Sequence, residues 1–412
     1  IGGSFSNIET ALGQTSTASD TLIGANTTNA WAISGANSGT VNSFNFLGFG
    51  NLTGGAGADT FTVGSNGSLT GRLDGGSGRN MIVGPNLADT FNITANNAGN
   101  LNTSVIPSFI RIQNLTGGGQ PTSFVFGAGM SVTGNINGGT GGGTLNYQNY
   151  STNVSVNLQT SRATGVGGAA INLVGVTGGS GNNTLRGANT ASTWNITANN
   201  AGNINGAFTF TGFANLKGGT GTNDFVFSDQ QGVTGTIDGG GGSNRLDYSA
   251  YSTGLYVNLR TGVATGTGGI ENFKQVFGGN GNDILVGMGS GILLEEGTGN
   301  DLIIGGSGQA TIQSGSGQDI VIAGSTTYDN NQAALQAIED YWSTNGGTFA
   351  QRVAGLSSGI TGGYQLNSST VKHHGGSGDT IALGSANDWL FWRMVGSGKD
   401  TLTGTPGQST LI

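Results

Sequence analysis

Three aspartates recur at intervals of 18 residues in the last third of the chain, namely Asp283, Asp301 and Asp319. They lie in five nine-residue units that run without a gap from Gly278 to Ile322, and each is the sixth residue of its unit. If two units form one turn, the three carboxylates stack on one side, where like charges repel each other unless a cation lies between them. The spacing therefore predicts a one-sided row of cation-binding carboxylates.

The units read GGNGNDILV, GMGSGILLE, EGTGNDLII, GGSGQATIQ and SGSGQDIVI, with an aliphatic residue at every eighth position. This pattern resembles the RTX, or haemolysin-type, repeats of Gram-negative bacteria. In that family calcium is bound between the loops of neighbouring turns by aspartate and backbone oxygens, which suit a hard cation. The resemblance implies calcium as the cofactor and about two sites between turns. The alternative is that the aspartates only cap turns.

Carried onto this chain, the resemblance implicates two sets of metal ligands. The five units supply Asp283, Asp301, Asp319, Asn282, Asn300, Gly278, Asn280, Gly297 and Thr298. Similar units return near the C-terminus, where Asp379, Asp388 and Asp400 take the sixth positions. That segment also resembles the C-terminal parts of large calcium-binding surface proteins of planctomycete-like bacteria.

A dense apolar group follows Asp388 in this otherwise polar chain. Its members are Trp389, Phe391, Trp392 and Met394. Two interpretations stay open: the group plugs the end of the fold, or it forms an interface for another subunit or the cell envelope.

Composition indicates a folded repeat protein rather than a disordered or collagen-like chain. Glycine accounts for 83 of 412 residues, without a three-residue period and with only four prolines. Charged residues make up 8% and hydrophobic residues 34%, whereas disorder requires high charge and low hydrophobicity. The surface is expected to consist mostly of uncharged Ser, Thr, Asn and Gly, which offers little repulsion against self-association.

Several classes of function are disfavoured. A net charge of −8 with 13 scattered basic residues argues against nucleic-acid binding. No cysteine and no long apolar run is present, so neither thiolate chemistry nor a transmembrane segment is expected. The H-E-x-x-H motif is missing, and His373 and His374, which are adjacent, are expected at the surface. We therefore predict that the protein is not an enzyme and assign no catalytic residue.

Longer, degenerate modules precede the nonapeptides. They begin near residues 20, 80 and 183 and place Trp31, Phe91 and Trp194 at one equivalent position, where we expect core residues. Most of their loops end in asparagine where the nonapeptides have aspartate. Because asparagine is a weaker calcium ligand, we expect these turns to be metal-free and held by backbone and amide ladders. Asp59 alone keeps the complete loop pattern.

Residues 326–360 change character and predict a helical insertion. Asp329 is the expected N-cap, and a second short helix is expected over 348–356. The apolar positions at helical spacing are Ala334, Leu335, Ile338 and Trp342. An apolar face of this size is too small for an independent core, so the insertion should pack on the strands.

The predicted fold is all-β: a right-handed parallel β-solenoid or β-roll with a short helical insertion near the C-terminus. We expect degenerate modules over 1–277, a calcium-binding roll over 278–325, the insertion over 326–360 and a capping or docking segment over 361–412. The chain opens on a sequence that resembles the middle of a module, so it is expected to be part of a longer protein.

The expected function is that of a secreted, calcium-stabilised structural protein of the bacterial cell surface or extracellular matrix. Its expected location is extracellular, in a Gram-negative-type bacterium, and its expected partners are further copies in a head-to-tail polymer that forms filaments, a sheath or a layer. The alternative is a spacer or adhesive segment of a giant surface adhesin that contacts glycans or a cell-surface polysaccharide. A polysaccharide-modifying enzyme ranks third.

Overall fold

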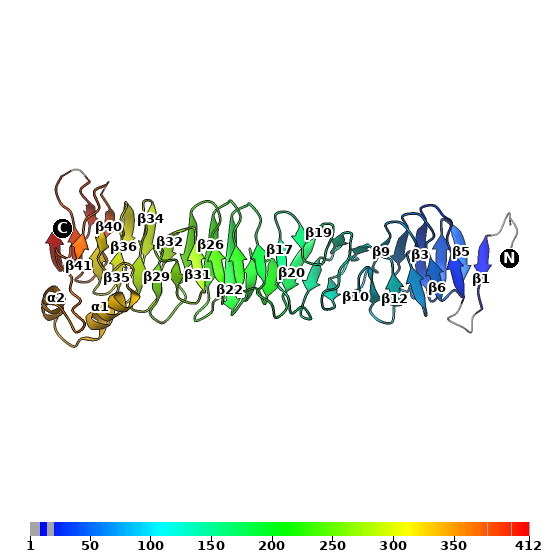
Figure 1. Ribbon diagram of the computed structural model, residues 1–412, viewed down its shortest axis with the longest axis horizontal. Coiled ribbons are helices and arrows are strands. Elements are labelled where there is room, and N and C mark those ends of the chain that lie inside the picture. Colours follow the sequence, from blue (N-terminus) through cyan, green and yellow to red (C-terminus); the bar gives the residue numbers. More distant parts are fainter. Residues whose placement is uncertain (1–8, 15–19, 377, 397, 412) are drawn as a thin grey trace. The chain divides into compact units, whose positions relative to one another are not determined.

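The computed structural model describes residues 9–14, 20–376, 378–396 and 398–411. Within these ranges the protein is mostly β, with 43 short strands and two helices, and its sheets are rich in parallel pairs (Figure 1). The predicted all-β class with a helical insertion is confirmed at this level. The chain forms two compact units, which are described in turn.

The first unit comprises the residues up to Arg186 together with Ala207–Phe213. Its strands are β1 (Thr10–Leu12), β2 (Thr21–Ile23), β3 (Ala30–Gly35), β4 (Ser38–Val41), β5 (Phe44–Leu47), β6 (Asn51–Thr53), β7 (Thr60–Val63), β8 (Arg72–Asp74), β9 (Met81–Val83), β10 (Asp89–Ala95), β11 (Ala98–Leu101), β12 (Ile106–Ile110), β13 (Asn114–Thr116), β14 (Thr122–Phe126), β15 (Ile136–Asn137), β16 (Gly143–Asn146), β17 (Ser155–Asn157), β18 (Arg162–Ala163), β19 (Ala170–Ile171), β20 (Leu173–Thr177), β21 (Thr184–Arg186) and β24 (Phe208–Thr211).

Parallel ladders in this unit are interrupted by antiparallel excursions that the sequence analysis did not predict. Strand β10 pairs with β14 in parallel, but also with its neighbour β11 in antiparallel register. The turn between β10 and β11 contains Asn97 at φ 57°, in the left-handed region that asparagine tolerates. Asn37, between β3 and β4, has the same conformation at φ 52°. Two-residue turns of this kind reverse the chain into a hairpin.

The second unit comprises Gly187–Gly206 and Ala214 onward. Its strands are β22 (Ser192–Ala198), β23 (Ala201–Ile204), β25 (Asn215–Lys217), β26 (Asn223–Phe227), β27 (Thr236–Asp238), β28 (Asn244–Asp247), β29 (Tyr256–Asn258), β30 (Val263–Ala264), β31 (Gly269–Glu271), β32 (Phe273–Phe277), β33 (Ile284–Val286), β34 (Ile292–Glu295), β35 (Leu302–Ile304), β36 (Ala310–Gln313), β37 (Ile320–Ile322), β38 (Ser325–Thr326), β39 (Val371–Lys372), β40 (Thr380–Ala382), β41 (Trp389–Trp392), β42 (Thr401–Thr403) and β43 (Gln408–Leu411). Its helices are α1 (Gln332–Thr344) and α2 (Phe349–Ser358).

The five nonapeptides form two parallel ladders with an 18-residue register. In one ladder β33 pairs with β35 and β35 with β37, so that Leu285 lies opposite Ile303 and Ile303 opposite Val321. In the other, β34 pairs with β36 and places Leu294 opposite Ile312. All five of these eighth-position side chains are fully buried. Two units per repeat, as the spacing of the aspartates predicts, is therefore what the strands show.

Helices α1 and α2 cover the outer face of the ladder β33–β35–β37–β41, where they lie beside β35 and β41 in Figure 1. One apolar cluster joins Leu335, Ile338 and Trp342 of α1 and Leu356 of α2 to both outer-facing residues of each of these strands. The predicted apolar face of the insertion and its packing on the strands are confirmed.

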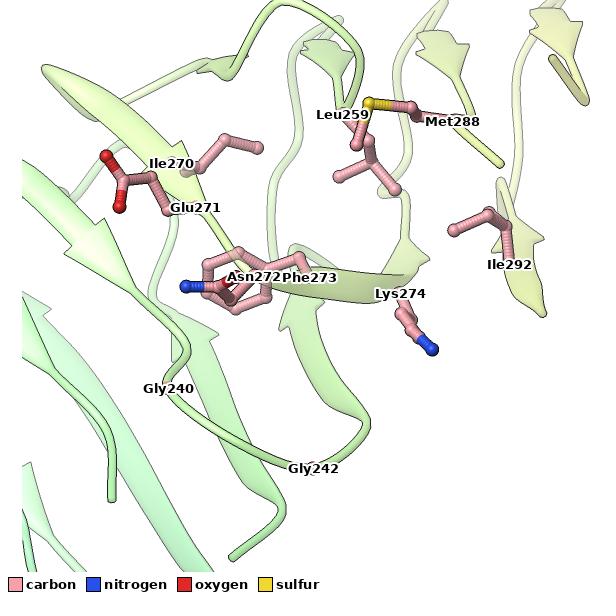
Figure 2. A pocket seen from close by; sticks show the side chains of 10 residues that line it. All are labelled: Gly240, Gly242, Leu259, Ile270, Glu271, Asn272, Phe273, Lys274, Met288 and Ile292. Atoms are coloured by element: carbon pink, nitrogen blue, oxygen red, sulfur yellow. The ribbon is translucent and has the colours of Figure 1, made fainter. Parts of the chain in front are cut away.

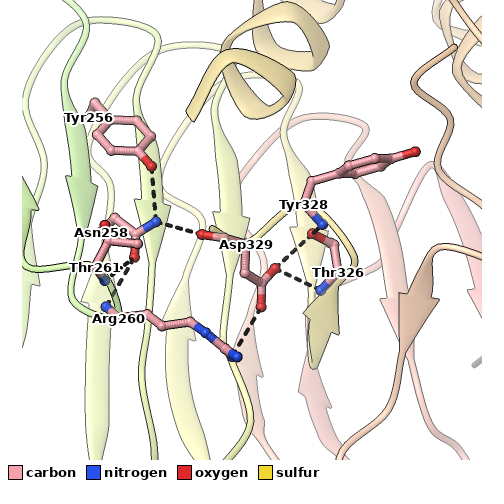
Figure 3. Close-up of polar contacts among 7 residues, drawn as sticks. All are labelled: Tyr256, Asn258, Arg260, Thr261, Thr326, Tyr328 and Asp329. Carbon is pink, nitrogen blue, oxygen red and sulfur yellow. Dashed lines mark hydrogen bonds and ion pairs between the residues drawn. The ribbon is translucent and has the colours of Figure 1, made fainter. Parts of the chain in front are cut away.

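The N-cap of α1 differs from the prediction. Asn331, not Asp329, caps the helix by accepting a hydrogen bond from the backbone N–H of Ala334 at 3.2 Å. Asp329 accepts from the backbone N–H and the hydroxyl of Thr326, both at 2.7 Å, and lies 3.7 Å from Arg260. Asn258 donates to the carbonyl of Asp329 at 2.7 Å (Figure 3). Asp329 therefore fastens the start of the insertion to the strand β29 instead of starting the helix.

The aromatic side chains of the upstream modules fill the core, as predicted. Trp31 stacks on Phe61 with ring centroids 5.5 Å apart, and Trp194 stacks on Phe225 at 5.3 Å. Phe91 is fully buried in the same way. Each stacked pair joins two strands that are parallel neighbours, so these rings support the ladders from inside.

Candidate metal centre

Four aspartates form one column, connected by backbone hydrogen bonds. The N–H of Asp283 donates to Oδ1 of Asp301 at 2.6 Å, and the N–H of Asp301 donates to Oδ1 of Asp319 at 3.0 Å. Asp388 continues this column beyond the helical insertion, because its Oδ1 accepts from the N–H of Asp319 at 3.1 Å. All four side chains belong to fully buried residues. The stacking expected from the 18-residue spacing is therefore present, and Asp388 extends it.

The second carboxylate oxygen of each aspartate separates the column into two kinds of position. Oδ2 of Asp283 accepts from the N–H of Gly279 at 2.9 Å, and Oδ2 of Asp388 accepts from the hydroxyl of Ser314 at 3.1 Å. Oδ2 of Asp301 and Oδ2 of Asp319 are buried and have no hydrogen-bond partner among the described residues. An unsatisfied buried acceptor costs about 1–3 kcal/mol, and more when it is charged. The middle of the column therefore lacks a positive group.

Glu296 lies beside these two aspartates, a residue that the sequence analysis missed. Carboxylate oxygens of Glu296, Asp301 and Asp319 lie within 4.8 Å of one another. The glutamate is fully buried, and neither of its oxygens has a hydrogen-bond partner within the part of the chain that the structure describes. The available signal was positional, because Glu296 stands first in its unit, where the repeat pattern has glycine.

Burial perturbs the pKa of every carboxyl in this cluster. It raises the pKa of Asp301 to about 8 and that of Asp319 to about 9, against a backbone hydrogen bond that lowers each. Burial and then the nearby charges of Asp319 and Asp301 raise the pKa of Glu296 well above its ordinary value. At neutral pH these groups therefore hold protons or require a compensating cation.

The asparagines at the equivalent positions upstream have a side-chain N–H donor that the aspartates lack. Oδ1 of Asn183 accepts from the N–H of Val154 at 2.8 Å, as an aspartate Oδ1 does in the column. The Nδ2 group of Asn183 then donates to the carbonyls of Gly179 at 2.8 Å and Gly212 at 2.7 Å. Asn223 repeats the arrangement with two loop carbonyls. The amide ladder expected for these turns is present, and its N–H groups occupy the place where an aspartate presents an oxygen.

Asp59 is the acidic exception in the first unit. Its Oδ1 accepts from the backbone N–H of Asn29 at 2.8 Å and from the side-chain amide of Asn29 at 2.7 Å. Its Oδ2 is buried and has no hydrogen-bond partner in the described ranges. In the column of sixth positions its neighbours are Asn29 and Asn80, so it stands as a single acid between amides.

The predicted loop ligands already bond to one another. Asn300 donates its N–H to Oδ1 of Asn282 at 2.9 Å, and the hydroxyl of Thr298 donates to Oδ1 of Asn280 at 3.1 Å. The carbonyl of Gly297 accepts from the N–H of Ser316 at 2.9 Å. Gly297 also has φ 100°, and a Cβ there would lie 2.3 Å from the carbonyl oxygen of Gly279.

Gly278 has a related role, because a Cβ at this position would lie 2.6 Å from Oδ2 of Asp283. These loops are therefore closely packed, and the fit to a cation is best at the buried carboxylates rather than at the loop carbonyls.

Asp379 and Asp400 belong to a different column from Asp301. Oδ1 of Asp379 accepts from the N–H of Ala310 at 2.6 Å, and Oδ1 of Asp400 accepts from the N–H of Asp379 at 2.8 Å. Oδ2 of Asp379 lies 3.1 Å from Nε2 of His374. His373 and His374 are both largely buried, so their expected surface location is wrong, since they pack against these aspartates.

The predicted interface residues are divided between core and surface. Trp389 and Phe391 are buried in the apolar cluster beneath the helices, where the Trp389 ring lies 6.0 Å from that of Trp342. Trp392 is half-buried, and Met394 is 49% exposed. Trp389 and Phe391 are therefore core residues of this chain. Contact of the group with a second copy of the chain stays a prediction.

The second unit also has a hollow of about 240 Å³. Its lining is half polar and half apolar, with Leu259, Phe273 and Met288 among the apolar side chains and Glu271 and Lys274 as the charged groups (Figure 2). The side chains of Glu271 and Lys274 point away from each other in this view. The hollow therefore brings no acid and base together.

Gly355-Leu356-Ser357-Ser358-Gly359 matches the letters of the G-x-S-x-G motif. It forms the C-terminal end of helix α2, whereas a nucleophile elbow requires a turn from a strand into a helix. Among the described residues, neither helix has the length and apolar character that crossing a membrane requires.

Comparison with protein-family models and with curated proteins found no match to this chain.

Proposed function

We propose that this protein is a secreted, calcium-stabilised structural protein of the bacterial cell surface or extracellular matrix, built as a right-handed parallel β-solenoid. The observation that carries the proposal is the pair of buried, unpartnered Oδ2 atoms on Asp301 and Asp319, set against the satisfied amides at the same positions upstream. In the asparagine turns, the side-chain N–H groups bond to the carbonyl oxygens of the loop. In the aspartate turns, a cation would be the positive partner of the carboxylate oxygens.

Calcium is the ion that the donor set favours. The candidate ligands are all oxygens, and hard cations such as calcium bind oxygen ligands, whereas zinc and copper prefer sulfur and imidazole. Asp301 and Asp319 would contribute ligands to the ion, which would neutralise their charge and crosslink two neighbouring turns. Because the site exists only in the folded state, the free energy of metal binding adds to the free energy of folding. The ion would therefore stabilise this part of the fold.

A structural role agrees with the rest of the molecule. Short parallel strands in an 18-residue register build a repetitive backbone ladder, and repeat proteins of this kind gain stability from each interface between neighbours. Only 8% of the residues are charged, which leaves little electrostatic repulsion between copies. We extend the proposal to head-to-tail assembly into filaments, a sheath or a layer.

The test is hydrogen exchange with and without a calcium chelator. Amides of residues 278–322 should lose protection when calcium is removed, while the asparagine turns around Asn183 and Asn223 keep theirs. These turns are the internal control, because their side-chain amides already satisfy the loop carbonyls. Equal protection of residues 278–322 in both conditions would refute the calcium-stabilised role.

A further inference from the structure

In several aspartate-bearing units the first residue lies beside a carboxylate column, and its type differs from unit to unit. In the unit of Asp319 this residue is Ser314, whose hydroxyl donates to Oδ2 of Asp388 at 3.1 Å. In the unit of Asp379 it is His374, whose Nε2 lies 3.1 Å from Oδ2 of its own aspartate. A polar residue at this position can therefore supply a donor to a carboxylate oxygen.

Glu296 occupies the same first position and supplies no donor. It adds a third carboxylate to two aspartates that already lack a partner for one oxygen each. With both oxygens of Glu296, the cluster contains four buried, unpartnered oxygens. Several adjacent buried negative charges without a counter-charge are strongly unfavourable, so this arrangement requires protons or a cation.

The spacing of the oxygens suits a single ion. Calcium binds its oxygen ligands at about 2.3–2.6 Å, so two ligands on opposite sides of one ion lie about 5 Å apart. The carboxylate oxygens of Glu296, Asp301 and Asp319 lie within 4.8 Å of one another, inside that limit. One ion between the three side chains can therefore reach all of them.

We propose that Glu296, Asp301 and Asp319 form an interior site for one hard divalent cation, and that Glu296 is the residue that creates it. The site differs from one built of loop carbonyls, because its ligands are three carboxylates from the protein interior. The proposal deepens the proposed function and rests on it, since it places the stabilising ion at one position of the column.

The test is isothermal titration calorimetry, in which calcium chloride is added to the full chain after treatment with chelator and the number of bound ions per chain is measured. Glu296→Gln should remove one bound ion per chain, because the amide replaces a charged ligand. Glu295→Gln is the matched control, since it removes the same charge from the neighbouring, half-buried residue and should leave the stoichiometry unchanged. Should Glu296→Gln fold poorly, Glu296→Gly restores the residue type found at Gly278 and allows the same measurement.

The outcomes separate the two proposals. Loss of one ion in both Glu296 variants, with an unchanged control, supports the interior site. A wild-type chain that binds calcium with the same stoichiometry and affinity as both Glu296 variants overturns the interior site and leaves the calcium-stabilised role standing. A wild-type chain that binds no calcium overturns both.

Discussion

Asp301→Asn should have opposite effects on stability with and without calcium. The new side chain keeps Oδ1, which accepts the N–H of Asp283, and replaces the unpartnered Oδ2 with an N–H donor. That donor can bond the carboxylate of Glu296 or the loop carbonyls, as the amide of Asn183 does upstream. The substitution removes one buried charge and satisfies one buried acceptor, but it also removes a ligand of the proposed ion.

The size of the effect follows from burial. The pKa of Asp301 rises from 3.8 to about 8 in the fold, so without a cation the group takes up a proton at neutral pH. Over the roughly three pH units between its ordinary pKa and pH 7, that uptake costs about 4 kcal/mol at 1.36 kcal/mol per unit. Satisfying the acceptor alone is worth about 1–3 kcal/mol. In chelator the variant should therefore be more stable than the wild type by about 1–4 kcal/mol.

Calcium should reverse the order. An ion present at about a thousandfold above its Kd stabilises the wild-type fold by about 4.1 kcal/mol, which exceeds the advantage of about 1–4 kcal/mol that the variant has in chelator, and the variant should lose most of this calcium-dependent stabilisation. Thermal unfolding followed by circular dichroism, in chelator and in calcium, measures both arms. Asp340→Asn is the control, because Asp340 is exposed on α1 and its substitution should shift neither arm. A variant that is less stable than the wild type in chelator would refute the reasoning.

Two further predictions concern pH and the helical cover. In chelator the raised pKa values of Asp283 (about 7), Asp301 (about 8) and Asp319 (about 9) mean that the folded state binds more protons than the unfolded one. The contribution of these carboxyl groups to stability is complete below their ordinary pKa and is lost as the pH rises through their raised pKa values. In chelator the melting temperature should therefore fall between about pH 5 and pH 9. In calcium the melting temperature should stay level or rise over the same range, because the metal binds the deprotonated carboxylates. Trp342→Ala should cost about 3–5 kcal/mol in urea unfolding, because the side chain is fully buried between the helices and the strands, whereas Trp392→Ala, at a half-buried site, should cost much less.

The column of aspartates could be predicted because its cause is local and periodic. Asp283, Asp301 and Asp319 are spaced by two units, and short strands with an aliphatic eighth residue leave one compact way of stacking. Asp388 could be placed in a nonapeptide but not in this column. Its neighbour in the column is 69 residues away, across an insertion whose length gives no register.

The face of the sheet that the helices cover could also have been predicted from the sequence, from residues that the nonapeptide pattern leaves variable. In the units with aspartate, the seventh and ninth residues are both apolar, as the strands ILV, LII and IVI show, whereas the intervening units have Leu and Glu or Thr and Gln at these positions. A strand that is apolar on both faces is typical of a sheet covered on both sides. Read this way, the three strands predict a cover over β33, β35 and β37, which is where α1 and α2 pack.

Glu296 was not predicted as a site residue, for a different reason. The repeat pattern treats the first position as a loop glycine, and a glutamate in a loop is ordinarily a solvated surface residue. Only the structure shows that this position is fully buried and that its side chain meets Asp301 and Asp319. A departure from the pattern toward a charged residue was therefore the informative feature.

Gln318 connects the helical cover to the carboxylate column. Its carbonyl accepts from the indole N–H of Trp342, its side-chain oxygen accepts from Arg352, and its own N–H donates to Asn300 at 2.9 Å. Because Gln318 directly precedes Asp319, a shift of that aspartate on loss of the proposed cation would be passed to the contacts that hold α1 and α2. Glu339 of α1 adds to this connection, since it is buried and the charge of Asp283 is among the causes that raise its pKa to about 7, after burial itself. The insertion is thus attached to buried carboxylates that lack a counter-charge, and the proposed cation should stabilise the strands and their helical cover together.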